Sequence, residues 1–245
     1  AWRDHTLTNW YDWQIASPQY LVDIMMLVEE YLTPEQKENY LAMFEHYLYE
    51  HCYSSMFSDA GMNVLYTVEC WIGAAILQSD ASQAQEAVSA LHNCFSWADS
   101  FPTGEGFYTD GSCLFHYKHA MTGTYGAGQF SKSGMILSVL RDTKLDFTNP
   151  RRENVFDWVF DAFEPLIYEG DVFHMVMGRS DGSGHYVTRN IVKGMLDLLE
   201  FAQGETLAKM KSLIKYIVTL EKAGGRVSYN DTAFSLPQIK KLNEI

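Results

Sequence analysis

The segment MNVLYTVECWIGAAIL, residues 62–77, is nearly all apolar and decides the class of fold. An apolar segment of this length that carries only one charged residue is expected to form a helix buried on most of its sides. No stretch of the chain approaches the ~20 uninterrupted apolar residues that span a bilayer. The segment therefore predicts a buried helix in a domain built of helices.

Helical signals continue on both sides of this segment. Ser17-Pro18 predicts an N-cap followed by a first-turn proline, and an apolar stripe then runs from Leu21 to Leu32. Thr33-Pro34-Glu35-Gln36 has the pattern of a capping box for a helix that ends near Tyr49. The remaining helices are expected at residues 82–98, 127–140, 151–167, 189–202 and 205–222.

Sequential helices joined by short turns pair as antiparallel hairpins. No self-similarity of about 34 residues is present, which excludes a regular solenoid. The predicted class is all-α, with the hairpins arranged as a toroid or as an irregular bundle. One domain is expected over residues 1–230, followed by an exit segment at 231–245. Loops are expected at 101–117 and 169–188, and only Arg226–Tyr229 has the pattern of a strand.

Composition limits the kinds of partner. The 245 residues include 18 Lys and Arg against 31 Asp and Glu, which gives a formal net charge of −13. An acidic surface argues against general binding of nucleic acids or anionic membranes. Aromatic residues make up 14% of the chain, and surplus Trp and Tyr rings often line sugar-binding clefts.

Neither a metal nor a cofactor is expected. The pair His116-x-x-His119 lacks a third zinc ligand, and Gly123, Gly126 and Gly128 do not follow a strand as a dinucleotide fingerprint requires. The four cysteines fit no zinc or redox spacing, which favours small core residues, with two disulfides as the alternative. These cysteines are Cys52, Cys70, Cys94 and Cys113.

Residues 106–128, which begin in the expected loop at 101–117, are the most informative stretch, because they concentrate two His, three Tyr and five Gly. Loops carry binding and catalytic groups more often than helices do. His116 can titrate near neutral pH, and a tyrosine phenol can act as acid or base in a suitable environment. The alternative interpretation makes His116 and His119 structural hydrogen-bonding residues.

Asp110-Gly111-Ser112, His116 and Thr122-Gly123-Thr124-Tyr125-Gly126 resemble the D-G-S-x-x-x-H-x-x-x-x-x-T-G-x-Y-G run of polysaccharide lyase family 8. That family contains the hyaluronate, chondroitin AC and xanthan lyases. Three further segments resemble family motifs in the same order. They are Asn9-Trp10-Tyr11 through Pro18 (N-W-[WY]-x-x-x-I-G-x-P), Gly61-Met62-Asn63 (G-A-N) and Met177-Gly178-Arg179-Ser180 (the start of G-R-x-I-S-R).

The resemblance implies an incomplete α/α toroid and a role for each matched residue. Asn63 would neutralise a uronate carboxylate, while His116 and Tyr125 would move protons, with His116 favoured as base and Tyr125 as acid. Tyr125 acting as both acid and base is the alternative. Substrate would also be held by Arg179, by Arg189, and by an entrance patch of Asn9, Trp10, Tyr11 and Phe57.

The chain departs from the family pattern in several places. Position 183 is Ser where the family's second arginine is expected, so Arg189 is a weaker match. Helices that precede the tryptophan motif in the family, and the β-sandwich domains that follow the toroid, have no counterpart here. Alternative interpretations make Trp10 and Trp13 core anchors and Arg179 half of a surface ion pair.

The function implied by the resemblance is β-elimination in a uronic-acid-containing polysaccharide, at a secreted or cell-surface location. A glycoside hydrolase is the first alternative and would need two carboxylates flanking the scissile bond, from among Glu105, Asp110 and Asp181. The second alternative is a non-catalytic glycan-binding domain or an inactive fragment that lacks its β-sandwich partner.

Overall fold

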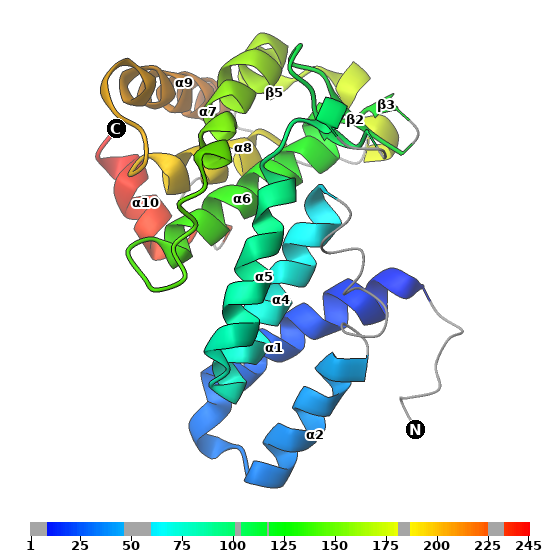
Figure 1. Ribbon diagram of the computed structural model, residues 1–245. Coiled ribbons are helices and arrows are strands. Elements are labelled where there is room, and N and C mark those ends of the chain that lie inside the picture. The colour runs from blue at the N-terminus through cyan, green and yellow to red at the C-terminus, as the bar shows by residue number, and fades with distance from the viewer. Residues whose placement is uncertain (1–8, 47–59, 101–103, 117, 181–186, 225–232) are drawn as a thin grey trace. The chain divides into compact units, whose positions relative to one another are not determined.

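The computed structural model describes residues 9–46, 60–100, 104–116, 118–180, 187–224 and 233–245. The expected contributions of Phe57, Cys52 and Asp181, and the strand at 226–229, lie outside these residues. The chain divides into two compact units, Ala1–Cys94 and Phe95–Ile245, and each is described by itself. Helices dominate both units, so the all-α prediction is confirmed (Figure 1).

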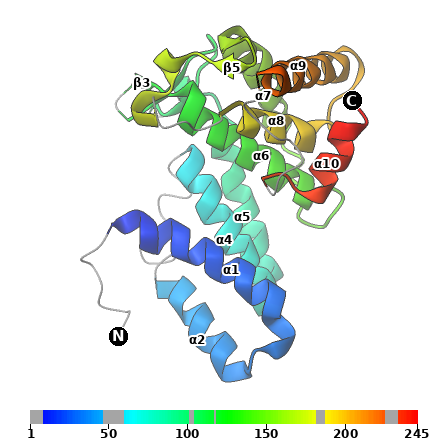
Figure 2. The same cartoon turned by 180° about the vertical axis from the view of Figure 1, so that it is seen from behind.

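The first unit contains helices α1 (Ser17–Val28), α2 (Pro34–Phe44), α4 (Met62–Gln78) and α5 (Ala81–Cys94). The helices α4 and α5 form an antiparallel hairpin and lie side by side in Figures 1 and 2. Ser79 ends α4 with a left-handed φ of 58°. The Asp80 carboxylate then accepts hydrogen bonds from the backbone N–H groups of Ser82 and Gln83, which caps the start of α5.

Helix α4 is the buried helix that its sequence predicts, because eleven of its residues are buried and are spread around its circumference. Gly73 lets α1 approach α4 closely, since a Cβ built on this glycine would lie 2.5 Å from Cγ1 of Val22.

The described cysteines are buried in the core. Cys70, Cys94 and Cys113 are buried thiols, so the prediction of core cysteines is confirmed for these three and no disulfide joins them.

The start of the first helix differs from the prediction. Ser17 does not cap α1, because the chain is already helical from Trp10 and passes through a π-helical turn at Asp12–Ala16. Pro18 has no N–H to donate to the preceding turn, and a local change of helical pitch accommodates such a residue. The second predicted cap is confirmed, because Thr33 and Gln36 exchange the two hydrogen bonds of a capping box.

The second unit is built on α6 (Ala127–Leu140) and α8 (Val187–Leu198), with α7 (Asn154–Asp157), α9 (Gly204–Ala223) and α10 (Leu236–Asn243) around them. The backbones of α6 and α8 touch where two glycines meet. A Cβ on Gly134 would lie 2.8 Å from the carbonyl oxygen of Gly194, and one on Gly194 would lie 2.6 Å from the Phe130 ring. This close crossing gives the unit a dense centre.

An aromatic core lies beside that crossing. The Trp158 ring stacks on Phe107 at a centroid distance of 4.3 Å and on Phe95 at 6.1 Å.

The single helix predicted at 151–167 is wrong in detail. This stretch comprises a 3-10 turn at Pro150–Glu153, α7, a π-helical turn at Trp158–Phe163 and a 3-10 turn at Glu164–Leu166. Pro165 cannot donate a helical hydrogen bond, which favours termination there.

Short antiparallel strands lie in and beside the loops predicted at 101–117 and 169–188. The first loop contains β1 (Gly106–Phe107) and β2 (Cys113–Phe115), and β3 (His119–Ala120) follows it. The second loop contains β5 (Asp171–Val172), which pairs with β4 (Ile167–Tyr168) just before it. Glu169 and Gly170 both have positive φ values, as a tight two-residue hairpin requires. Strands of two or three residues are too short to leave a periodic signal in the sequence.

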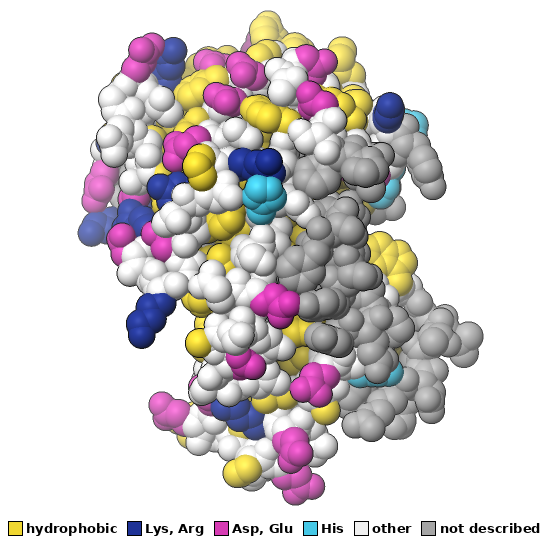
Figure 3. All heavy atoms as spheres, in the orientation of Figure 1, with side chains coloured by type: hydrophobic (Ala, Val, Ile, Leu, Met, Phe, Trp, Pro, Cys, Tyr) yellow, Lys and Arg dark blue, Asp and Glu magenta, His cyan; other side chains and the backbone are white. Residues whose placement is uncertain are grey.

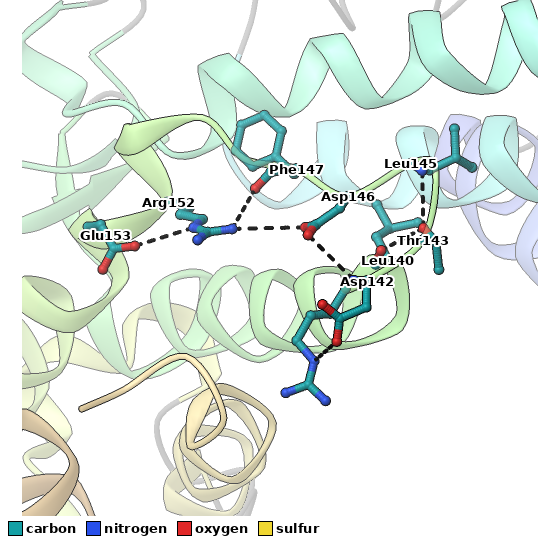
Figure 4. Close-up of polar contacts among 9 residues, drawn as sticks. Leu140, Asp142, Thr143, Leu145, Asp146, Phe147, Arg152 and Glu153 are labelled. Carbon is teal, nitrogen blue, oxygen red and sulfur yellow. Dashed lines mark hydrogen bonds and ion pairs between the residues drawn. The ribbon is translucent and has the colours of Figure 1, made fainter.

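The connection from α6 to α7 is held by polar contacts (Figure 4). Arg152 donates to the carbonyl oxygen of Phe147 at 3.2 Å and lies 3.9 Å from the Asp146 carboxylate. The Thr143 hydroxyl donates to the carbonyl oxygen of Leu140 at 2.6 Å and accepts from the N–H of Leu145 at 3.1 Å. These bonds satisfy backbone groups beyond the end of α6.

The segment at 231–245, expected to leave the domain, contains helix α10, which packs on α8 in the second unit. Ser235 and Gln238 form a capping box that starts this helix. The Gln238 amide also donates to the Asp197 carboxylate at 2.8 Å, and Lys241 donates to the carbonyl oxygen of Leu196 at 3.1 Å. The domain boundary at residue 230 itself stays a prediction.

Two general features bear on function. On the described residues of the face drawn in Figure 3, Asp and Glu side chains are spread across the surface, as expected of a chain with a formal net charge of −13. Within the described ranges, no helix combines the length and the apolar character needed to cross a membrane.

Candidate active site

His116 and Tyr125 lie together in the second unit. Their ring centroids are 4.7 Å apart and their planes are nearly perpendicular, at 89°. His116 is exposed and Tyr125 is half-buried, so neither residue belongs to the buried core. The structure therefore brings together the two residues that the sequence singles out for proton transfer.

The β2–β3 hairpin presents His116 at its tip. Phe115 and His119 form the last pair of the ladder, and His116 follows Phe115 directly. His116 and Lys118 have φ values of 46° and 73°, in the left-handed region that residues with a Cβ rarely occupy. The backbone N–H of His116 donates to a carboxylate oxygen of Glu105 at 2.9 Å, which ties the hairpin tip to the residue before β1.

Tyr125 lies in a π-helical turn, Thr122–Gly126, that leads into α6. A Cβ on Gly123 would lie 2.6 Å from the Met177 sulfur, and one on Gly126 would lie 2.8 Å from the Cys113 sulfur. These contacts place the turn between strand β2 and the segment around Met177. The Phe115 ring, 5.2 Å from the Tyr125 ring, packs against it as well.

The Asp110-Gly111-Ser112 motif forms a tight turn. The Asp110 carboxylate accepts hydrogen bonds from the Ser112 N–H at 2.9 Å and the Ser112 hydroxyl at 2.7 Å. These bonds lower the pKa of Asp110, because they favour the ionised form. Gly111, with a φ of 83°, packs against the backbone of Asp161, where a Cβ would collide.

The two arginines occupy different elements of the second unit. Arg179 belongs to a 3-10 turn, Gly178–Ser180. Gly178 has a φ of 54° and packs on Met121, just before the turn that carries Tyr125. Arg189 lies in α8 and is half-buried. Its neighbour Thr188 donates a buried hydrogen bond to Glu221.

The remaining candidates lie in the first unit. Asn63 is exposed in the first turn of α4, directly after Gly61 and Met62. Trp10 and Tyr11 are 53% and 39% exposed, with ring centroids 6.1 Å apart in an edge-to-face arrangement. Asn9 accepts a hydrogen bond from the Tyr11 N–H at 3.3 Å. The exposure of Trp10 contradicts its alternative interpretation as a core anchor.

The structure thus groups the candidates in two sets, one in each unit. Convergence of the two sets around one substrate stays a prediction. Glu105 contacts His116, which the sequence did not predict, because Glu105 was considered only as one of the carboxylates available to a hydrolase. Its hydrogen bond to His116 spans eleven residues, and no local motif signals such a contact. Among the described residues, no three His, Cys, Asp or Glu side chains form a group that could hold a metal ion.

A profile of the family described as "Polysaccharide lyase family 8, N terminal alpha-helical domain" matches residues 2–216. The chain belongs to polysaccharide lyase family 8, which confirms the resemblance found in its motifs. It is 26% identical over 223 residues to a xanthan lyase of Bacillus sp. (strain GL1), covering 88% of this chain and 23% of that protein. It is 21% identical over 252 residues to a hyaluronate lyase of Staphylococcus aureus (strain NCTC 8325 / PS 47), covering 97% and 31%.

Solved structures show the same fold. A Paenibacillus xanthan lyase superposes with a TM-score of 0.78 at 25% identity, covering 97% of this chain and 22% of the other. A mutant of the Streptomyces coelicolor A3 chondroitin AC lyase gives a TM-score of 0.78 at 23% identity, covering 97% and 33%. These neighbours agree with the predicted α/α-toroid type of helical domain. The chain therefore spans between 22% and 33% of the length of these structural neighbours.

Proposed function

We propose that this chain is the helical catalytic part of a secreted or cell-surface lyase that cleaves a uronic-acid-containing polysaccharide by β-elimination. The observation that carries the proposal is the pairing of His116 with Tyr125 at 4.7 Å in a member of polysaccharide lyase family 8. Relatives named for xanthan and hyaluronate support an acidic polysaccharide as the class of substrate.

The chemistry begins with the weakly acidic C5–H of a uronate. Removal of this proton places negative charge on the adjacent carboxylate, so neutralisation of that group lowers the barrier. The Asn63 amide can donate hydrogen bonds to the carboxylate without adding a competing charge. A single donor of this kind commonly contributes about 3 kcal/mol of transition-state stabilisation.

Two protons then move at neighbouring atoms. The C5–H electron pair forms the C4–C5 double bond while the C4–O bond breaks, and the departing oxygen takes up a proton. His116 is the proposed base and Tyr125 the proposed acid, and each must come within about 3 Å of its atom. Because the two rings are in edge-to-face contact, one can reach the C5 proton while the other reaches the departing oxygen on C4 of the same linkage. This geometry supports His116 as the base and Tyr125 as the acid. Tyr125 acting as both base and acid is the variant mechanism.

Other residues would bind the polymer around the reacting sugar. Trp10 and Tyr11 are exposed rings suited to stacking on sugar faces, and Asn9 shapes the turn that carries them. Arg179 and Arg189 are proposed to bind anionic groups of the substrate. Because the relatives are several times longer than this chain, a β-sandwich domain is the proposed partner that completes the enzyme.

A glycoside hydrolase fits the described carboxylates less well. The Glu105 carboxylate accepts the His116 N–H, and the Asp110 carboxylate accepts the N–H and the hydroxyl of Ser112. Both groups therefore bind parts of their own loop, whereas a hydrolase needs two carboxylates facing one glycosidic bond.

The test uses hyaluronan, chondroitin and xanthan in parallel with the purified chain. Elimination gives an unsaturated uronate that absorbs in the near ultraviolet, whereas hydrolysis gives no new double bond. We expect absorbance to rise with at least one polymer. New reducing ends without absorbance would establish a hydrolase, and binding by calorimetry without either product would establish a non-catalytic domain.

A further inference from the structure

Glu105 stands immediately before strand β1, and its side chain reaches across to the β2–β3 hairpin tip. One carboxylate oxygen accepts the backbone N–H of His116 at 2.9 Å. Glu105 is half-buried, and β1 holds it in place through the pairs Gly106–Leu114 and Phe107–Cys113. A hydrogen bond to an ionised acceptor is stronger than one between neutral groups.

The contact acts on a backbone position that needs support. His116 has a φ of 46°, and non-glycine residues keep such values only where the surroundings impose them. The ladder pair Phe115–His119 restrains the residues that flank the tip. The Glu105 carboxylate restrains His116 itself, through its N–H.

Backbone orientation at His116 decides the direction of its Cα–Cβ bond, and hence where the imidazole lies. The observed direction places the imidazole edge-to-face with the Tyr125 ring. We infer that Glu105 is a positioning residue, whose hydrogen bond to the His116 backbone holds the imidazole against Tyr125. This inference deepens the proposed function and rests on it for its catalytic consequence, but its structural part can be tested without turnover.

The experiment compares Glu105→Ala with Glu105→Gln, whose amide oxygen can still accept the N–H. Glu205→Ala is the matched control, because Glu205 is an exposed glutamate on α9 that pairs with Lys209 at 2.9 Å. Three quantities are measured: cross-peaks between the His116 and Tyr125 rings by NMR, hydrogen exchange of the His116 amide, and kcat and KM on the most reactive polymer.

We expect Glu105→Ala to abolish the ring cross-peaks and to speed exchange of the His116 amide at least about tenfold. Misplacement of a catalytic group by about 1 Å can cost about 100-fold in rate, so kcat should fall by about that factor with KM nearly unchanged. Glu105→Gln should keep the cross-peaks and most of kcat. Glu205→Ala should change none of these quantities.

The inference is overturned if Glu105→Ala keeps the cross-peaks and slow exchange, or if Glu105→Gln is as defective as Glu105→Ala. If the Ala variant does not fold, Glu105→Asp, one methylene shorter, replaces it and should show the same losses. If the wild-type chain shows no elimination, the proposed function fails, while the NMR and exchange measurements still decide whether Glu105 positions His116.

Discussion

The imidazole of His116 and the phenol ring of Tyr125 meet at 89° with centroids 4.7 Å apart, although one belongs to a hairpin tip and the other to a π-helical turn. Both elements contact residues outside themselves. The Glu105 carboxylate accepts the N–H of His116 at the hairpin tip, and Gly123 and Gly126 leave room for Met177 and Cys113 beside the turn. The candidate site is therefore a product of packing between short segments.

Replacement of Tyr125 by Phe should abolish most turnover while preserving substrate binding. The ring contacts with His116 and Phe115 are retained, and only the hydroxyl that would transfer a proton is removed. General acid–base groups contribute about 100- to 10,000-fold, so the elimination rate should fall within that range. Absorbance of the product measures the rate, and calorimetry measures binding. Tyr216→Phe, at an exposed position on α9, is the control, and an unchanged rate in Tyr125→Phe would remove the phenol from the mechanism.

Asn63→Ala should lower the elimination rate about 100- to 1,000-fold, because the amide donor to the uronate carboxylate is lost. Stability should change little, since the side chain is exposed. The backbone carbonyl of Asn63, which accepts from the Thr67 hydroxyl at 3.1 Å, is unaffected by the substitution. Rates and thermal unfolding are measured on the same preparation. A normal rate would show that Asn63 does not neutralise the carboxylate.

Gly123→Ala should destabilise the turn that carries Tyr125. The new methyl group would lie 2.6 Å from the Met177 sulfur and 3.3 Å from the carbonyl oxygen of Val176. Overpacking of this kind typically costs about 1–3 kcal/mol, and the accompanying backbone shift should lower kcat as well. Urea unfolding gives the free energy. Val139→Ala, at an exposed position of α6, should cost far less, and equal stability of the two variants would contradict the tight packing at Gly123.

Asp197→Asn should stabilise the chain at neutral pH. Burial raises the pKa of Asp197 from 3.8 to about 6, against the opposing effect of the hydrogen bond from Gln238. Because the pKa of Asp197 is higher in the folded than in the unfolded state, protonation of this group stabilises the folded state. This contribution to the free energy of unfolding is complete below pH ~4 and is lost as the pH rises through ~6. The Asn variant avoids a buried charge and keeps an oxygen to accept the Gln238 N–H.

Unfolding of Asp197→Asn and of the wild-type chain in urea at pH 7.5 and pH 4.5 tests the predicted direction of this pH dependence. The variant should gain on the order of 2–3 kcal/mol relative to wild type at the higher pH, and the gain should shrink at the lower pH. Glu244→Gln, an exposed substitution near the chain end, should show no such dependence. A gain independent of pH would exclude ionisation of Asp197 as its cause.

Much of the helical framework could be predicted from the sequence. The apolar run at 62–77, the capping box at Thr33 and the periodic segment at 127–140 each correspond to a helix. Where a helix prediction was wrong, a proline without an N–H lies in the segment concerned, at Pro18 and at Pro165. The stretch expected as one helix at 151–167 is divided into α7 and three short turns, and Ser17 does not cap α1, because the chain is already helical from Trp10.

For the candidate residues too, the sequence and the tertiary structure supply different information. The amino-acid sequence by itself determined most of the helical segments and pointed to the candidate residues, because periodicity, caps and motifs are properties of neighbouring residues. Only the tertiary structure decided that His116 touches Tyr125, and that Glu105, eleven residues before His116, binds its backbone. Such contacts depend on left-handed backbone angles and on side-chain packing between distant segments, and no local spacing encodes them.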